Sequence, residues 1–414
     1  MGWGKELFSV ITLAEALEVL EPYVQPLYER KEEVSLSTSL GRVVAVDVPA
    51  RGPLPHFRKS TVDGLAVRAQ DTFGASESLP ALVQVRGEVM MGRAPRETLD
   101  LGQGLLIPTG GMLPAEADAV VMLEHLEDFG EGLYGVTKAV APGENVIDIG
   151  EDLQAGEVIL PQYTVIRAQE MGLLASQGIL SVPVLTRVRV GILSTGDEIV
   201  SPESEPLPAQ ARDINGYTLL GQAIEAGFEA HYYGIAADEP AELRSILEHM
   251  LAENDVVILS GGSSVGARDL TAQMMGELGQ PGLLFHGLAL RPGKPTIGGV
   301  VGDKIIIGLP GHPASAMVVF DTLVRPLLDG SRRRSEFPWP EVKLSQNVYS
   351  GTGREEFVRV RLEQEDGNWL AEPVRGKSGL IRTMVLANGL VHIPLNVEGI
   401  QAGEKVKVRP LRRY

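Results

Sequence analysis

The sequence has 414 residues, of which 44% are hydrophobic and 22% charged, so it is long enough for several globular domains and is not typical of a disordered or fibrous protein. Its 37 basic and 54 acidic residues give a formal net charge of −17, which argues against general binding to nucleic acid or to anionic membranes. The absence of cysteine excludes disulfides, thiolate metal sites and thiol nucleophiles, while 48 glycines and 27 prolines indicate many loops and sharp turns.

The first half of the chain combines a helical start with a long β-rich segment. Thr12 and Glu15 form a capping-box pattern ahead of leucines at helical spacing, which predicts a helix from residue 13. No apolar run approaches the roughly 18 residues of a membrane-spanning helix, and no leader is visible, so we expect a cytoplasmic protein. Short alternating runs separated by glycine and proline predict strands at 43–48, 82–85, 105–108 and 119–123. A second helix is predicted over about 167–176.

Between residues 187 and 330, apolar strands alternate with helices. The predicted strands are 188–193, 229–235, 255–259 and 304–309, and the predicted helices are 217–226, 240–253 and 313–328. This alternation is typical of a mostly parallel, doubly wound sheet. Further strands at 356–362, 369–373, 390–393 and 405–408 then predict a small C-terminal β domain.

Polar and glycine-rich loops follow the predicted parallel strands, at the edge where ligands bind in open α/β sheets. These loops carry Ser194, Thr195, Gly196 and Glu198; Asp238; Ser260, Gly261, Gly262, Ser264, Gly266 and Asp269; and Pro310, Gly311 and Pro313. The glycine-rich loop offers backbone N–H groups suited to phosphate, but it matches neither a Walker A nor a dinucleotide motif, and a plain strand-to-helix turn is the alternative.

Two charge patterns allow a functional or a structural interpretation. Arg291 and Lys294 lie in a proline-stiffened turn, which suits phosphate or oxyanion contact but could also be a rigid connector. Glu198, Asp238 and Asp269 could each be a helix cap or a solvated acid; together, beside a phosphate cradle, they are the hard oxygen ligands that Mg²⁺ requires.

Other metal and nucleophile arrangements are poorly supported. The seven histidines include no His-x-x-x-His pair, which argues against zinc. A triad of His312 with Ser315 lacks the Gly-x-Ser-x-Gly elbow. Outside the α/β region, the loop containing Asp63 and the turn containing Thr109 combine carboxylate and hydroxyl groups, although ordinary turns would have the same composition.

Taken together, these segments resemble the molybdenum insertase family, which includes bacterial MoeA and the E domain of gephyrin (molybdopterin molybdenumtransferase). The resemblance rests on an ordered set of motifs at 60–67, 108–110, 143–146 with 150–152, 194–198, 213–215, 260–266 with Asp269, 291–295 and 308–313, and it extends through 376–389. It implies a multidomain α/β fold in which a MogA-like, molybdopterin-binding parallel-sheet domain is flanked by a β-rich inserted domain and a small C-terminal β-barrel-like domain.

The resemblance also implies a homodimer whose active site is shared between subunits. The implied domains are an N-terminal linker and dimerisation domain (1–48 plus 156–186), the inserted domain (49–155), the catalytic domain (187–330) and the C-terminal domain (331–414). Adenylylated molybdopterin and molybdate would be the substrates, and Mg²⁺-dependent hydrolysis would release AMP and molybdenum cofactor. A transient contact with the molybdopterin adenylyltransferase would supply the substrate.

Residue by residue, the resemblance implies catalytic roles for Asp63, Thr109, Glu198, Asp238, Asp269 and Lys294, with the three later acids binding the metal. It implies substrate contacts for Asp152, Ser194, Thr195, Gly196, Ser260, Gly261, Gly262, Ser264, Gly266, Arg291, Pro310, Gly311, Pro313 and Ser378.

The chain departs from the family pattern at positions that concern oxyanion contact. His312 stands where the family commonly has Asn, Arg291 where Lys is common, Leu65 where an aromatic is usual and Ser263 where Val is usual. A tungsten-specific insertase, a molybdopterin adenylyltransferase and a non-enzymatic scaffold are therefore the alternatives to a molybdate insertase.

Overall fold

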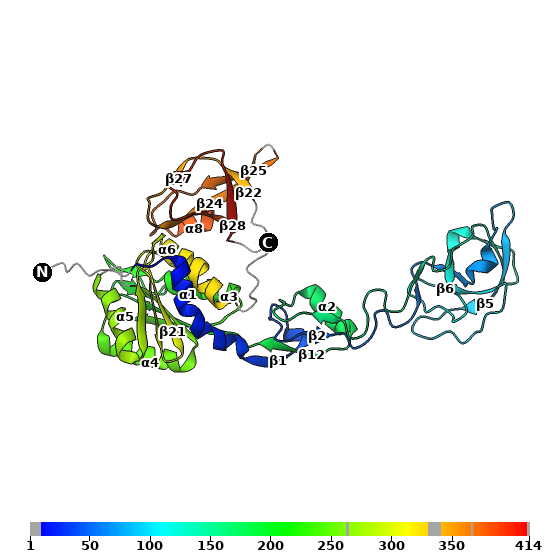
Figure 1. Cartoon of the computed structure of the whole chain (residues 1–414), viewed down its shortest axis with the longest axis horizontal. Helices are drawn as coiled ribbons and strands as arrows, with labels where there is room; N and C mark the ends of the chain where they lie inside the picture. The colour runs from blue at the N-terminus through cyan, green and yellow to red at the C-terminus, as the bar shows by residue number, and fades with distance from the viewer. Residues whose placement is uncertain (1–9, 262–264, 330–340, 366, 412–414) are drawn as a thin grey trace. The chain divides into compact units, whose positions relative to one another are not determined.

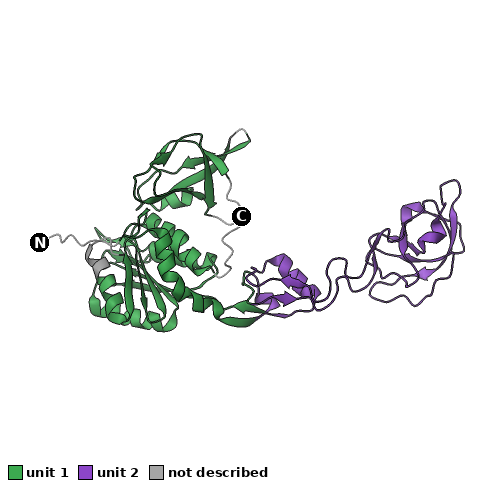
Figure 2. Ribbon diagram, viewed as in Figure 1, with its two compact units in different colours: residues 1–33, 41–45, 183–414 green, residues 34–40, 46–182 purple. Residues whose placement is uncertain are grey.

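A computed structural model describes residues 10–261, 265–329, 341–365 and 367–411, without the side chains of 265–269 and 365. The chain forms two compact units, one of residues 1–33, 41–45 and 183–414 and the other of residues 34–40 and 46–182 (Figure 2). The finer division into four domains stays a prediction. None of the helices in the described ranges combines the length and apolarity needed to cross a membrane.

The smaller unit is built around a six-stranded sheet of order β7-β4-β6-β5-β9-β8. Its strands are β4 (Gly64–Val67), β5 (Ala81–Glu88), β6 (Gln103–Ile107), β7 (Ala119–Met122), β8 (Leu126–Asp128) and β9 (Leu133–Val136). Alternate residues of β4 pack on opposite faces: Leu65 and Val67 enter one apolar cluster and Ala66 another. The same unit contains β2 (Val48–Pro49), β3 (Lys59–Ser60), β10 (Val146–Ile147), β11 (Val158–Leu160) and α2 (Ala168–Ser176).

The predictions for this part of the chain are confirmed at the strands β5, β6 and β7 and at α2, and one is wrong. The run 43–48 forms no continuous strand, because Val44 makes only an isolated bridge with Val184 and β2 begins at Val48. The Ala45 N–H donates to the carbonyl of Pro183. Proline has no N–H with which to return that bond, so the ladder ends there.

In the larger unit, the α/β part contains a six-stranded sheet of order β16-β13-β17-β21-β20-β18. Four parallel strands confirm the predicted doubly wound sheet: β13 (Arg189–Thr195), β16 (Glu229–Ala236), β17 (Val256–Gly261) and β21 (Lys304–Leu309). Two antiparallel strands, β18 (Pro281–His286) and β20 (Ile297–Val301), were not predicted. Glycines in β20 hide it from pattern reading: a Cβ on Gly298 would lie 2.2 Å from the Phe285 ring.

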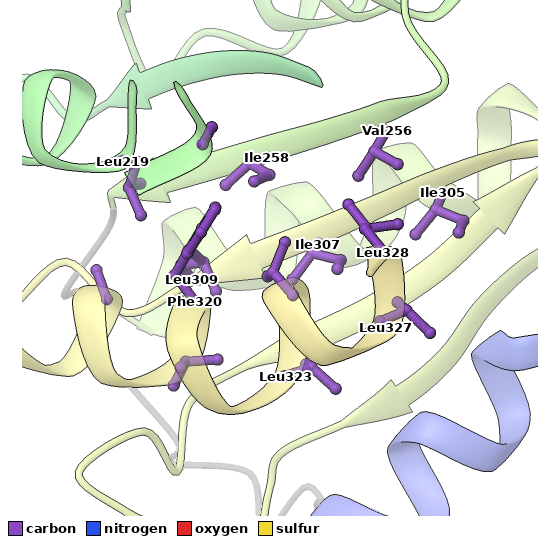
Figure 3. Packing of buried hydrophobic residues seen from close by; sticks show 14 of the residues in the cluster. Leu219, Val256, Ile258, Ile305, Ile307, Leu309, Phe320, Leu323, Leu327 and Leu328 are labelled. Atoms are coloured by element: carbon purple, nitrogen blue, oxygen red, sulfur yellow. The ribbon is translucent and has the colours of Figure 1, made fainter. Parts of the chain in front are cut away.

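Helices cover both faces of this sheet, as continuous apolar strands require. On one side lie α1 (Leu13–Val24), α3 (Asn215–Glu225), and α6 (Pro313–Val319) continued through a π-helical turn into α7 (Arg325–Leu328); on the other lie α4 (Pro240–Glu253) and α5 (Val265–Leu278). Within β17, Val256 and Ile258 pack toward the first group, and Val257 and Leu259 toward the second. Figure 3 shows Phe320 and Leu323 of the first group against these strands.

The C-terminal region is a closed five-stranded barrel, which confirms the predicted β-barrel-like domain (Figure 1). Its strands are β22 (Glu341–Leu344), β24 (Glu355–Glu365), β25 (Asn368–Pro373), β26 (Gly389–Ile393) and β28 (Lys405–Pro410). Pairing of β24 with β26 closes the barrel, and a short helix, α8 (Arg382–Leu386), precedes β26. The strand β19 (Leu290–Arg291) of the α/β part pairs with β24.

A buried carboxylate joins the amino ends of the central parallel strands. Asp255, whose side chain is 1% exposed, accepts two hydrogen bonds from Arg30 (2.9 and 2.8 Å) and one from the backbone N–H of Arg189 (2.9 Å). Lys304 lies 3.9 Å away at the start of β21. Burial alone would raise the pKa of Asp255, but the hydrogen bonds from Arg30 and Arg189 outweigh it and lower the pKa to about 2.

We predict that Asp255→Asn lowers the free energy of unfolding at pH 7 by about 2 kcal/mol or more, because it removes a carboxylate with a depressed pKa and leaves Arg30 without its partner. The contribution of this group is fully present above about pH 4 and is lost as the pH falls toward about 2, so wild type and variant should converge there. Urea denaturation at several pH values measures the difference.

Asp303→Asn is the matched control, because Asp303 is 86% exposed and contacts only Lys304, at 3.7 Å. It should change the unfolding free energy by less than about 0.5 kcal/mol. An Asp255 variant as stable as this control at pH 7 would contradict the structural role of the buried carboxylate.

Candidate functional site

The parallel strands β13, β16, β17 and β21 bring their carboxyl ends to one edge of the sheet. Thr195 at the end of β13 pairs with Gly261 of β17 on one side and Ala236 of β16 on the other. A Cβ on Gly261 would lie 1.8 Å from the Thr195 carbonyl oxygen, so only glycine allows this approach. Ser260 pairs with Leu309, so the loop containing Pro310 also begins at this edge.

Three carboxylates gather in the loops after β13 and β16. The Asp238 N–H donates to Asp197 Oδ1 at 3.2 Å, and Asp197 and Glu198 are exposed. Burial, followed by the negative charges of Asp197 and Glu198, raises the pKa of Asp238. A Cβ on Gly196 would lie 2.8 Å from Glu198 Oε2, so glycine here leaves room for the acid. The cluster carries excess negative charge that a cation would relieve.

The third predicted metal ligand does not allow a test. The side chain of Asp269, near the start of α5, and the residues Gly262 and Ser264 lie outside the described residues, and Gly266 is described only as part of that helix. No group of three His, Asp or Glu side chains arranged to hold a metal occurs in the described part of the chain. A magnesium site formed by Glu198, Asp238 and Asp269 therefore stays a prediction.

A buried network behind this edge was not predicted as part of the site. Asp213, 6% exposed, accepts hydrogen bonds from Ser194 Oγ (2.8 Å), Tyr232 Oη (2.6 Å) and the Gly216 N–H (3.1 Å). Burial, together with the hydrogen bond to Asp213, raises the pKa of the Tyr232 hydroxyl. The Ser194 hydroxyl is thus committed to Asp213, and it orders the loop from within.

Asn215, at the start of α3, connects two of the predicted loops. Its Nδ2 donates to Ser260 Oγ at 2.8 Å and to the Gly311 carbonyl at 2.8 Å. The side chain is 7% exposed, so these bonds hold the ends of β17 and β21 in a fixed relation. The motif 213–215 marked these residues, but their contacts span 19 to 96 positions and have no local sequence signal.

A cleft of about 1470 Å³ collects the predicted basic turn, the Pro-Gly-His-Pro loop and Ser378 in the larger unit. Arg291, Lys294, Pro310, Gly311 and Ser378 all line it, and Pro313, buried at the start of α6, adjoins it. Four further basic residues from the C-terminal region line the same space, namely Arg354, Arg359, Arg375 and Lys377. Glu356 is the one acidic residue among the residues that line it.

The lining cations differ in how they are held. Arg359 donates to Thr383 Oγ1 (2.6 Å) and to the Gly376 carbonyl (2.8 Å), and burial lowers its pKa. Arg291 lies 3.5 Å from Glu356. Lys294 is exposed, so its ammonium is the cation of the predicted turn with access to a ligand in the cleft.

The smaller unit holds the two predicted residues Asp63 and Thr109 in direct contact. The Thr109 N–H and Oγ1 both donate to Asp63 Oδ1, at 2.6 and 2.9 Å. These two hydrogen bonds lower the pKa of Asp63, so the group is a fixed carboxylate at neutral pH. Asp152 is exposed in a separate turn, where its N–H donates to the Leu54 carbonyl at 3.0 Å.

Comparison with known proteins places these features in a family context. Three consecutive parts of the chain match family models: the MoeA N-terminal region (domain I and II) over 11–178, the probable molybdopterin binding domain over 191–330, and the MoeA C-terminal region (domain IV) over 341–411. A molybdopterin biosynthesis MoeA protein of known structure from Pyrococcus horikoshii is similar with a TM-score of 0.80 and 37% identity, covering 98% of this chain and all of that one.

Curated relatives agree with this match along nearly the whole chain. A putative molybdopterin biosynthesis protein of Methanocaldococcus jannaschii is 35% identical, covering 95% of this chain and 96% of that protein. The molybdopterin molybdenumtransferase of Bacillus subtilis is 33% identical, covering 92% of this chain and 90% of that protein. The chain therefore belongs to the molybdenum insertase (MoeA) family, the transferases of molybdenum cofactor biosynthesis.

Proposed function

We propose that this enzyme inserts molybdenum from molybdate into adenylylated molybdopterin, with Mg²⁺-dependent hydrolysis of the phosphoanhydride and release of AMP. The observation that carries the proposal is the cleft lined by six basic side chains and one acidic side chain in a chain of net charge −17. Such a local reversal of charge suits an anionic substrate, because both the oxyanion and the phosphates need neutralisation.

Cleavage of a phosphoanhydride demands positioning and charge neutralisation rather than a protein nucleophile. The crowded acids around Asp238 fit a divalent cation, because their negative charges already disfavour the ionised form of that carboxylate. Glu198, Asp238 and Asp269 would hold the Mg²⁺, which would neutralise charge on the phosphate oxygens. Lys294 and the N–H groups of the glycine-rich loop would bind the remaining oxygens.

The substrate must provide the sulfur ligands for molybdenum, since the chain has no cysteine. The basic cleft would take up the tetrahedral molybdate dianion through Lys294 and Ser378, which both line it. The buried Asp213 and Asn215 networks would keep the loops at the strand ends in place while the substrate binds.

We propose further that the enzyme works as a cytoplasmic homodimer, with Asp63, Thr109 and Asp152 of one subunit completing the site of the other. The two hydrogen bonds from Thr109 support a role for Asp63 as an oriented carboxylate. Handover of the adenylylated substrate would involve a transient contact with the molybdopterin adenylyltransferase.

Incubation of the purified protein with adenylylated molybdopterin, molybdate and Mg²⁺ tests the proposed reaction. We expect release of AMP and formation of a cofactor that activates a molybdenum-free apoenzyme. A parallel reaction with tungstate measures the choice of metal. Consumption of ATP with free molybdopterin, without AMP release from the adenylylated form, would instead identify an adenylyltransferase.

Replacement of Asp238 by Asn should separate activity from stability. We expect AMP release to fall by about 100-fold or more, because a metal-binding carboxylate is lost. Without Mg²⁺ the thermal midpoint should rise, because the raised pKa of Asp238 means that the folded state at neutral pH is strained by its charge. Calorimetry and the AMP assay measure the two effects; Asp303→Asn should alter neither, and an active Asp238→Asn enzyme would exclude the proposed role.

A complementation experiment tests the shared active site. Asp63→Ala and Asp238→Asn should each be nearly inactive, and mixing them under conditions of subunit exchange should restore about a quarter of wild-type activity, because half of the dimers then contain one intact site of two. The same mixture cross-linked before exchange provides the control. If the mixture stays inactive while light scattering shows exchanged dimers, Asp63 and Asp238 do not act across the dimer.

A further inference from the structure

Two of the side chains that line the basic cleft depart from the residues common in the family, and the structure gives them different surroundings. Arg291 Nη1 lies 3.5 Å from Glu356 Oε2, which also accepts a hydrogen bond from Ser350 Oγ at 2.9 Å. Part of the Arg291 charge is thus balanced by the one acid among the lining residues. His312 has no acidic neighbour of this kind in the described part of the chain, and it is exposed.

His312 connects the loop after β21 to the C-terminal region across one end of the cleft. Its Nδ1 lies 3.1 Å from Ser378 Oγ, and the Ala314 N–H donates to the Ser378 carbonyl at 3.1 Å. When Ser378 donates to Nδ1, the proton of the neutral ring is on Nε2, and in the imidazolium both nitrogens are donors. Either form can therefore present an N–H group beside the Ser378 hydroxyl.

The charged groups around His312 come from three elements that line the cleft. The turn after β19 contributes Arg291 and Lys294. The β24 strand and the loop before it contribute Arg354, Glu356 and Arg359, and the loop after β25 contributes Arg375 and Lys377. Six cations against one carboxylate disfavour a further positive charge in the empty cleft, whereas a bound dianion favours it.

We infer that His312 is a further oxyanion-binding side chain of this enzyme, and that its imidazolium form couples oxyanion binding to the uptake of a proton. The inference rests on the proposed function of the cleft as an oxyanion site. Histidine is the side chain whose charge changes most readily between about pH 5 and 8, and none of the lysines or arginines of the cleft can supply this dependence. An Asn at the same position could keep a hydrogen bond to Ser378 but could not change its charge.

Calorimetric titration of the full-length protein with molybdate, at several pH values between about 6 and 8, tests the inference. Molybdate remains a dianion across this range, so a change in affinity reports on the protein. We expect wild-type affinity to fall about five- to tenfold from the acidic to the alkaline end, as one partly screened charge contact is lost. Titrations in buffers of different ionisation enthalpy should show uptake of a fraction of a proton on binding.

His312→Asn should bind molybdate with an affinity that changes less than about twofold over the same range and should converge with wild type at the alkaline end. His249→Asn is the matched control: His249 lies on α4, does not line the cleft, and its loss should leave the pH profile unchanged. Wild-type binding without proton uptake, or proton uptake that persists in His312→Asn, would overturn the inference while leaving the oxyanion site intact. Failure of wild type to bind molybdate at any pH would overturn the proposed function of the cleft as well.

Discussion

The carboxylate of Asp255, buried among apolar strands, holds the amino ends of the parallel sheet together, and the chemistry at the opposite ends depends on that anchor. Its bonds to Arg30 and to the Arg189 backbone join the segment after α1 to the first residue of β13. Because neighbouring parallel strands keep one register, fixing their starts also fixes where they end. At those ends Thr195, Gly261 and Leu309 deliver their loops to one edge.

The site derives its character from a separation of charge. Acids gather after β13 and β16, where Asp197, Glu198 and Asp238 repel one another, while cations line a cleft formed with the C-terminal region. An acidic cluster favours a metal ion, and a basic cleft favours an oxyanion or phosphate. Both belong to the larger unit of the chain, and this division matches a reaction that must neutralise a phosphoanhydride and accept molybdate.

Buried networks rather than surface contacts keep these loops in place. Asp213 and Asn215 bind four partners from three elements, and each side chain is less than a tenth exposed. Since an unpaired polar group in such surroundings is costly, the networks hold one arrangement of the loops. The residues that face substrate can then remain exposed, as Glu198 and Lys294 do.

Much of the fold could be predicted because the parallel strands are continuous apolar runs and their order places the loops at one edge. The strand β20 was missed because Gly298 and Gly299, which pack closely against Phe285 and Gly282, read as turn signals. The pairing of His312 with Ser378 spans 66 positions, and the contact of Asp63 with Thr109 spans 46, so only the family resemblance marked them. Local patterns carry no information about contacts that the tertiary fold creates.

The most direct test of the account is a crystal structure of the enzyme soaked with tungstate, whose anomalous scattering locates the oxyanion independently of the refined coordinates. The account predicts a peak in the basic cleft, with Lys294, His312 and Ser378 as its polar neighbours. Strong anomalous density at the acidic strand ends, with none in the cleft, would contradict the assignment of the cleft to the oxyanion.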